Sequence, residues 1–216
     1  MSALAAIASS LLSSAVTVEE LIAQARKVAN TGDAAGADAL LVQAHELSPT
    51  LAEPLLLRGN VAAFLKRDAS AAEELYKASL VLEQRWDAYY FLGKTLSARV
   101  LPTAPIAAAE AFEAAAKLNP TNAAPLLELG GAWMQAGSWE RVHDAYRRAA
   151  ATDLHSEKPL LDLARAAAKL GLAAETRSAY RNVTEMHPWH AATMLEYAQW
   201  LAEAPPWSGD VVGAAQ

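Results

Sequence analysis

The 216-residue chain contains no cysteine, which excludes disulfides, thiolate metal sites and a cysteine nucleophile. Its first charged residue is Glu19, and no apolar run approaches the roughly 18 to 20 residues that a membrane-spanning helix needs. Lysine and arginine number 18 against 24 aspartates and glutamates, a net charge of −6, which argues against a surface that binds phosphates over the whole molecule. We therefore expect neither a nucleic-acid partner nor a membrane span.

Motifs for catalysis and cofactor binding are also missing from the chain. There is no glycine-rich phosphate loop and no serine in a nucleophile-elbow motif. His187 and His190 are three residues apart in an expected turn, and two ligands alone do not make a structural zinc site. His143 and His155 are expected on a solvated helix face and at a repeat boundary. We therefore expect no enzymatic activity, no metal and no cofactor.

The chain does contain a repeat of 34 residues. Equivalent residues recur at this interval in the pairs Leu129 and Leu163, Gly137 and Gly171, and Tyr146 and Tyr180. In the two copies that contain these residues, apolar residues at helical spacing mark a first helix, a glycine breaks the chain, and a tyrosine lies in a second helix. A fixed period near 34 with a two-helix unit is typical of a helical solenoid.

This pattern resembles the tetratricopeptide repeat (TPR) family. The best copy spans residues 123–156, with Leu126, Gly130 and Trp133 in the first helix and Tyr146 and Ala149 in the second. The resemblance implies an all-α, right-handed superhelical solenoid of stacked antiparallel helix pairs, with about five repeats plus a terminal helix. Because this family consists mostly of scaffold proteins, it also implies a role in protein–protein interaction.

We predict three parts along the chain. Residues 1–17 are expected to form an apolar helix that caps the first repeat, with one face made of Leu4, Ile7, Ala8, Leu11 and Ala15. The solenoid is expected over residues 18–204, with repeats at about 18–51, 52–85, 86–122, 123–156 and 157–190 and a partial repeat at 191–204. Residues 205–216 are expected to form a loose tail.

Both ends of the chain leave alternatives open. A secretory signal normally opens with positive charge, which is absent here, although the stretch Ser13-Ser14-Ala15 resembles a cleavage site. We therefore expect a cytoplasmic protein, with a cleaved signal as the alternative. The last predicted helix stops at Pro205 without a partner helix, so either it acts as a terminal cap or the native chain continues past Gln216.

The third repeat is expected to have a longer turn than the others. Gly93 and Gly130 are 37 residues apart, about three more than the period, and the stretch 98–105 contains two prolines that oppose helix formation. Val100 and Leu101 lie in this turn. They either contact a partner or fold onto neighbouring helices.

The first helices of stacked pairs line a concave side, and two rows of residues are placed there by the repeat spacing. One row is apolar: Ile22, Leu56, Tyr90, Leu127, Leu161 and Leu195. The other lies four residues further along each helix and is polar: Arg26, Asn60, Lys94, Gly131, Arg165 and Gln199. We predict that these rows form a groove for an amphipathic helix or an extended peptide with apolar anchors and a few acidic side chains. The alternative is that the apolar row is buried between neighbouring helices.

Other functions remain open at this point. Chaperone-tail receptors of the family clamp a terminal carboxylate with lysine and asparagine, but aliphatic and aromatic residues stand where that clamp needs a lysine, so we do not expect such a receptor. One rival function is a homo-oligomeric structural scaffold, joined through the N-terminal helix or the open C-terminal end. Another is the recruiting segment of a larger enzyme.

Overall fold

The computed structural model describes residues 16–153 and 156–203, and every regular element within these ranges is helical. The elements are α2 (Val18–Asn30), α3 (Ala34–Leu47), α4 (Ala52–Asn60), the π-helix η1 (Val61–Lys66), α5 (Ala69–Leu82), α6 (Trp86–Ser97), α7 (Ala104–Leu118), α8 (Ala123–Gln135), α9 (Trp139–Thr152), α10 (Glu157–Lys169), α11 (Ala173–Met186) and α12 (Ala191–Glu203). The predicted all-α class is confirmed. The predicted N-terminal cap before Val16, the tail at 205–216 and His155 lie outside the described residues.

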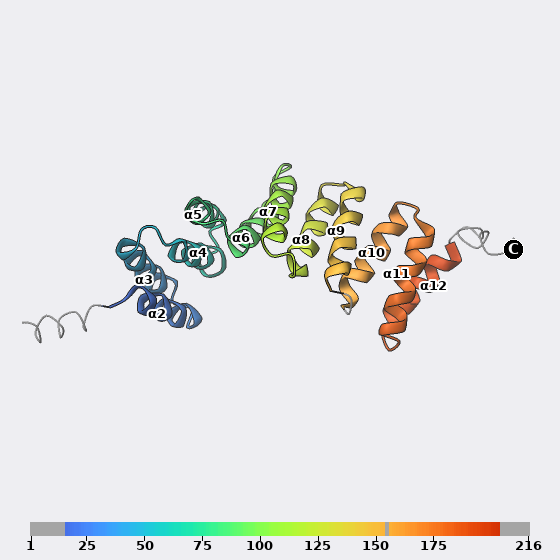
Figure 1. Cartoon of the computed structure of the whole chain (residues 1–216), viewed down its shortest axis with the longest axis horizontal. Coiled ribbons are helices and arrows are strands. Elements are labelled where there is room, and N and C mark those ends of the chain that lie inside the picture. Colours follow the sequence, from blue (N-terminus) through green and yellow to red (C-terminus); the bar gives the residue numbers. More distant parts are fainter. Residues whose placement is uncertain (1–15, 154–155, 204–216) are drawn as a thin grey trace, which may run out of the picture. The chain divides into compact units, whose positions relative to one another are not determined.

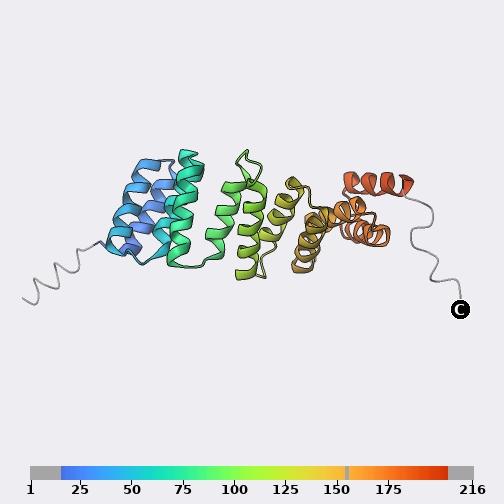
Figure 2. The same ribbon diagram turned by 90° about the horizontal axis from the view of Figure 1, so that it is seen from above.

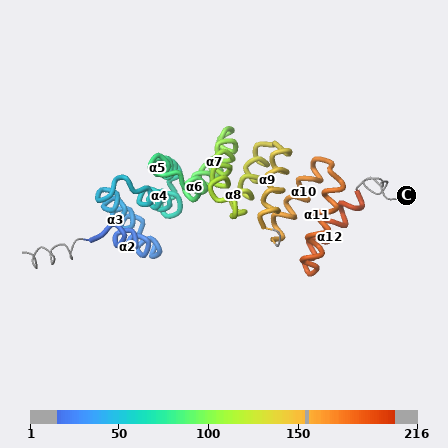
Figure 3. Tube along the Cα trace, in the orientation of Figure 1, coloured from blue at the N-terminus to red at the C-terminus, as the bar shows by residue number. Residues whose placement is uncertain are grey.

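The chain forms two compact units, Met1–Thr95 (unit 1) and Leu96–Gln216 (unit 2), which divide inside α6. In unit 1, α2 packs on α3, α3 on α4, and α4 on α5 (Figures 1 and 2). In unit 2, each helix from α7 to α12 packs on the next one along the chain (Figure 3). No helix in the described ranges is both long and apolar enough to cross a membrane.

Helix boundaries follow local signals in the sequence. Thr17 and Glu20 form a capping box at the start of α2, in which each backbone N–H donates to the other side chain at 3.0 and 3.2 Å. Proline lies in the first turn of three first helices, where a backbone N–H would have no helical partner: Pro54, Pro125 and Pro159. Three turns close on glycines whose φ angles of +84°, +75° and +72° favour that residue: Gly32, Gly137 and Gly171.

In two pairs, α4 with α5 and α8 with α9, a tyrosine ring of the second helix lies directly against a glycine of the first. A Cβ atom on Gly59 would lie 2.5 Å from the Tyr76 ring, and one on Gly130 would lie 2.6 Å from Cζ of Tyr146. Tyr76 is completely buried, and Tyr146 is 4% exposed. Real Cβ atoms do not approach rings this closely, so only glycine permits these two crossings.

The second pair contains an extra residue, which sequence analysis did not identify. Twelve residues separate equivalent buried positions of the first and second helices in three other pairs: Ala25 to Ala37, Gly130 to Val142, and Ala164 to Thr176. The same step from Gly59 to Ala72 takes 13 residues. The extra residue is accommodated by η1, where the N–H groups of Arg67 and Asp68 both donate to the carbonyl of Ala62.

The end of η1 differs from the other turns. Arg67 has a φ of 55° and occupies the place of Gly32, Gly137 and Gly171, shifted by the one extra residue. Such a conformation is strained for a residue with a Cβ atom, so the surrounding structure must hold it. Asp38 of α3 contributes to this by accepting from both Arg58 and Lys66 at 2.8 Å.

The longer turn of the third repeat is confirmed, because α6 ends at Ser97 and α7 begins at Ala104. Val100 is fully exposed and Leu101 is 48% exposed. The alternative that Val100 folds onto neighbouring helices was therefore wrong. Their alternative role as a partner contact stays a prediction.

Two adjacent glycines of α8 provide a test of the helix crossing. Gly130→Ala should destabilise unit 2 by about 1–3 kcal/mol, because the new methyl overlaps the Tyr146 ring. Gly131 has nothing within 4 Å of a Cβ position, so Gly131→Ala should stabilise by about 0.5–1 kcal/mol through helix propensity. Urea unfolding of both variants measures the difference, and equal effects would contradict the assigned packing.

Candidate functional site

The predicted apolar row of unit 1 is partly buried. Ile22 on α2 and Leu56 on α4 are 7% and 3% exposed, and Ile22 belongs to the core cluster of α2, α3 and Val61. For these two residues, the alternative of burial between helices describes the structure. Tyr90 on α6 is half-buried, so in unit 1 it is the member of this row that is accessible to a ligand.

The predicted row of unit 2 becomes more accessible toward its end. Leu127 on α8 and Leu161 on α10 are half-buried and pack against the core cluster around Tyr180. Leu195 on α12 is 60% exposed. Gln199 is exposed on the same helix. Equivalent positions in the repeat therefore differ in how far they face solvent.

The arginines of the polar row form ion pairs with acidic residues that lie outside this row. The Nη2 atom of Arg26 lies 2.7 Å from Oε1 of Glu53 on α4. In unit 2, Arg165 contacts both carboxylate oxygens of Glu196 on α12 at 2.7 and 2.8 Å. A carboxylate from a later helix therefore offsets the positive charge of Arg26 and that of Arg165. Lys94 is exposed on α6.

The Arg165–Glu196 pair belongs to a polar cluster that joins α10, α11 and α12. The hydroxyl of Tyr180 donates to Glu196 at 2.8 Å, and Asp162 accepts from Arg165 at 3.4 Å. The hydrogen bonds from Arg165 hold the pKa of Glu196 below its ordinary value. Burial raises the pKa of Asp162. This cluster is half-exposed and internally paired, so it stabilises the stack rather than offering a free charge.

The site in unit 1 begins with the hydroxyl of Tyr76. Its ring is buried, and the hydroxyl donates to Oδ1 of Asn60 at 2.9 Å. Burial raises the pKa of Tyr76, so the hydroxyl remains protonated, and its proton is used in the hydrogen bond to Asn60. Because Oδ1 of Asn60 accepts that bond, the amide NH₂ of Asn60 is turned away from Tyr76 and is left to donate elsewhere.

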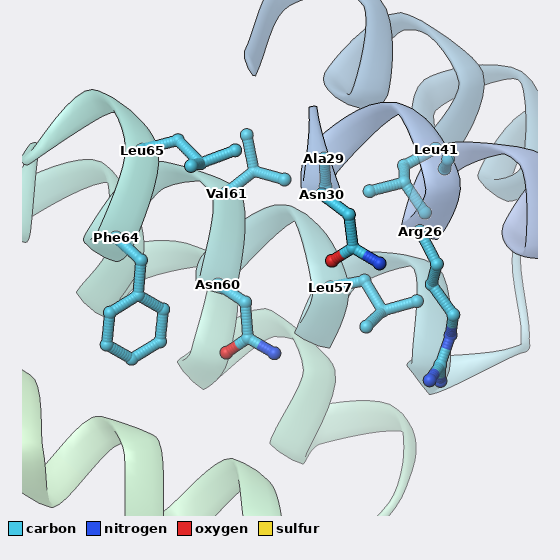
Figure 4. Close-up of a pocket in the computed structure, with 10 residues that line it drawn as sticks. Arg26, Ala29, Asn30, Leu41, Leu57, Asn60, Val61, Phe64 and Leu65 are labelled. Atoms are coloured by element: carbon cyan, nitrogen blue, oxygen red, sulfur yellow. The ribbon is translucent and has the colours of Figure 1, made fainter. Parts of the chain in front are cut away.

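Asn60 lies at the rim of a cavity of about 210 Å³ built by α2, α3, α4 and η1 (Figure 4). The apolar part of its lining consists of Ala25, Ala29, Leu41, Leu57, Val61 and Leu65. Phe64 also lines the cavity and is 58% exposed. Figure 4 shows Arg26, Asn30 and Asn60 extending to the same side, where their nitrogen atoms form a polar edge to an otherwise apolar pocket.

The pocket continues into a line of aromatic rings within unit 1, which we call the aromatic strip: Phe64, Phe91, Tyr90 and Trp86. Neighbouring ring centroids in this order are 5.8, 5.6 and 6.3 Å apart. Phe91 also stacks on the buried ring of Tyr76 at 6.2 Å. The predicted residue Tyr90 is therefore connected to the pocket by direct ring contacts. The sequence had not identified Asn30, Phe64 and Leu65 as site residues. The 13-residue step from Gly59 to Ala72 could have drawn attention to Phe64 and Leu65, whereas Asn30 on α2 carried no such signal.

Unit 2 has a larger cavity of about 500 Å³ between α7, α8 and α9, with a different character. Its charged lining residues largely pair with one another. Arg148 lies 2.9 Å from Glu113 and 3.6 Å from Asp144, and Lys117 lies 3.8 Å from Glu113. Such a lining selects neither an acidic nor a basic ligand. Among residues 16–153 and 156–203, no group of three or more His, Asp or Glu side chains is placed to hold a metal ion.

Comparison with known proteins identifies the fold. No protein-family model and no curated protein sequence matches the chain. MamA is 22% identical with a TM-score of 0.65, over 78% of this chain and 96% of MamA. YrrB, described as a TPR protein with an unusual peptide-binding site, is 16% identical with a TM-score of 0.67, over 88% of this chain and 97% of YrrB. A tetratricopeptide repeat protein from Parabacteroides merdae is 15% identical with a TM-score of 0.66, over 86% of this chain and 72% of that protein.

At these identities the likeness shows the fold. The chain has the tetratricopeptide-repeat fold, an all-α solenoid of helix pairs, as the resemblance in the sequence implied.

The polar cluster of unit 2 predicts a pH dependence. The folded-state pKa of Glu196 lies below its ordinary value of 4.5. The contribution of the Glu196 carboxylate to folding stability is therefore complete above pH 4.5 and is lost as the pH falls through the folded-state pKa. Glu196→Gln still accepts from Tyr180 but lacks the charge. The free energy of unfolding of wild type should exceed that of this variant by about 0.5–1 kcal/mol at pH 7. This difference should close as the pH falls below 4.5. Denaturant unfolding at several pH values measures the gap, and a constant gap down to pH 3 would contradict the assignment.

Proposed function

We propose that the chain is a protein-interaction scaffold that binds a peptide or a helical segment of another protein along the first helices of its repeats. The pocket of unit 1 is the observation that carries this proposal. It lies on the first helices α2 and α4, it is apolar, and it leads into the aromatic strip. Exposed apolar surface of this kind on a soluble domain is typical of an interaction site.

The predicted groove residues have different roles in this proposal. Tyr90 acts as an aromatic anchor, and Arg26 and Asn60 supply hydrogen bonds at the rim of the pocket. Ile22 and Leu56 support the helices from within the core. In unit 2, the proposed contacts are Leu127, Leu161, Arg165, Leu195 and Gln199, with Lys94 at the edge of unit 1.

We propose no reaction for this site. The charged groups beside the pocket, Arg26 and Glu53, are engaged with each other at 2.7 Å. An apolar floor with amide groups at the rim supports binding, and it offers neither a nucleophile nor a general base.

Self-association is a second candidate function, and it is supported by the last described helix. Met194, Leu195 and Leu201 of α12 are 46%, 60% and 44% exposed, and Trp189 in the preceding turn is 75% exposed. A second copy of the chain would cover these side chains. Light scattering that gives a dimer mass for wild type and a monomer mass for Leu195→Glu would support this candidate over the first.

Two adjacent tyrosines test the proposed binding face. A pull-down with the full chain first identifies partners, and Tyr90→Ala should weaken binding of the recovered partner by about 2 kcal/mol, roughly thirtyfold. Tyr89→Ala is the matched control, because the Tyr89 hydroxyl bonds to Gln84 and its ring is outside the aromatic strip. Calorimetric titration measures both affinities, and circular dichroism checks that each variant is folded. Equal affinities for wild type and Tyr90→Ala would rule out this face.

A further inference from the structure

We infer that the π-helix η1 builds an anchor pocket, which takes one large aliphatic or aromatic side chain from an acidic segment of a partner protein. This inference rests on the proposed function and names the chemistry of the ligand. Its first support is the extra residue. The three pairs with a 12-residue step reach a glycine turn after a regular α-helix, and only the pair with 13 residues contains η1 among the described elements.

The extra residue lengthens the apolar face of the first helix. Leu57, Val61, Phe64 and Leu65 all line the pocket, and the last three belong to η1. Phe64 and Leu65 are 58% and 37% exposed although both are large apolar side chains. Removal of this surface from water is favourable, so an apolar group placed in the pocket gains affinity there.

The size of the pocket limits what it can hold. Its volume of about 210 Å³ is below the roughly 300–1,000 Å³ of sites that enclose a whole small molecule. Arg26, Asn30 and Asn60 extend to one side of the pocket (Figure 4). One side chain, attached to a backbone that runs along these three residues, fits these dimensions.

The rim offers hydrogen-bond donors to the partner, and Glu53 offsets the charge of Arg26 there. Nη2 of Arg26 donates a hydrogen bond to Glu53. The remaining guanidinium N–H groups have no acceptor among the described residues. The Asn60 amide nitrogen is turned outward by the bond from Tyr76, and the Asn30 side chain makes no hydrogen bond within the described part of the chain. No aspartate or glutamate lines the pocket. The unused donors at the rim can bind a carboxylate or a backbone carbonyl of the partner, next to its anchoring side chain. The absence of an acid from the lining avoids repulsion of such a carboxylate.

Three small probes test this chemistry on the full-length, ¹⁵N-labelled chain. N-acetyl-L-leucine carries the side chain and a carboxylate, N-acetyl-L-leucinamide carries only the side chain, and N-acetylglycine carries only the carboxylate. We expect N-acetyl-L-leucine to bind with a Kd on the order of millimolar, as its size allows. The amide should bind about threefold to tenfold more weakly, and N-acetylglycine should not saturate. Amide chemical shifts should move around Ala29, Asn60 and Phe64.

Variants locate the probe in the pocket. Ala29→Leu fills it and should weaken N-acetyl-L-leucine binding at least about tenfold. Ala23→Leu is the matched control, because Ala23 is exposed on the same helix and does not line the pocket. Deletion of Ala63 restores the 12-residue step and should also abolish binding. Asn60→Asp keeps an acceptor for Tyr76 but replaces the outward amide by a charge, so it should reverse the preference between N-acetyl-L-leucine and its amide.

Several results would overturn the inference. One is binding of N-acetylglycine as tight as that of N-acetyl-L-leucine, and another is unchanged binding by Ala29→Leu. If Ile7→Asp with Leu11→Asp in the full chain raised probe affinity, the chain's own N-terminal segment would be the occupant. If sedimentation showed self-association that N-acetyl-L-leucine and Ala29→Leu both abolish, a second copy would be the occupant. If the probes fail while the partner still requires Tyr90, the proposed function stands without the anchor pocket.

Discussion

The packing of a tyrosine ring of the second helix against a glycine of the first sets the crossing of two helix pairs, and one of these pairs contributes to the candidate site. Gly59 with Tyr76 and Gly130 with Tyr146 bring paired helices into direct backbone-to-ring contact. In the second pair, the Tyr76 ring passes Gly59, and its hydroxyl donates a hydrogen bond to Asn60 on the first helix, α4. One side chain therefore sets both the helix crossing and the orientation of a polar group at the pocket.

Much of the fold was predictable, because each helix pair repeats a short list of local requirements. The 34-residue spacing of Tyr146 and Tyr180, and the glycines at the turns, are enough to place the helices in pairs. The π-helix was not predicted for a specific reason. The residue gained between Gly59 and Ala72 is lost again between Ala72 and Gly93, so the first helices keep their 34-residue period. Only a comparison of steps within each repeat detects it.

The candidate site was less predictable, because equal positions in a repeat do not have equal surroundings. Ile22 and Leu56 are buried, whereas Leu195 is exposed on the last described helix. The acids that pair with Arg26 and Arg165, Glu53 and Glu196, lie 27 and 31 residues further along the chain. A row read along one face of the first helices contains neither of these acids. Tyr90 was named from spacing alone, and its ring contacts with Phe91 and Trp86 connect it to a pocket that spacing did not reveal.

In our proposal, the extra residue between Gly59 and Ala72 makes α4 and η1 a binding element for an apolar, acidic segment. Selection of peptides from a random library displayed on phage, with the full chain as bait, tests this claim without any assumption about the partner. We expect a consensus in which one leucine, isoleucine or phenylalanine is followed or preceded within two residues by aspartate or glutamate. The enrichment should disappear when Ala29→Leu is the bait. A basic consensus, or the same consensus selected by Ala29→Leu, would contradict it.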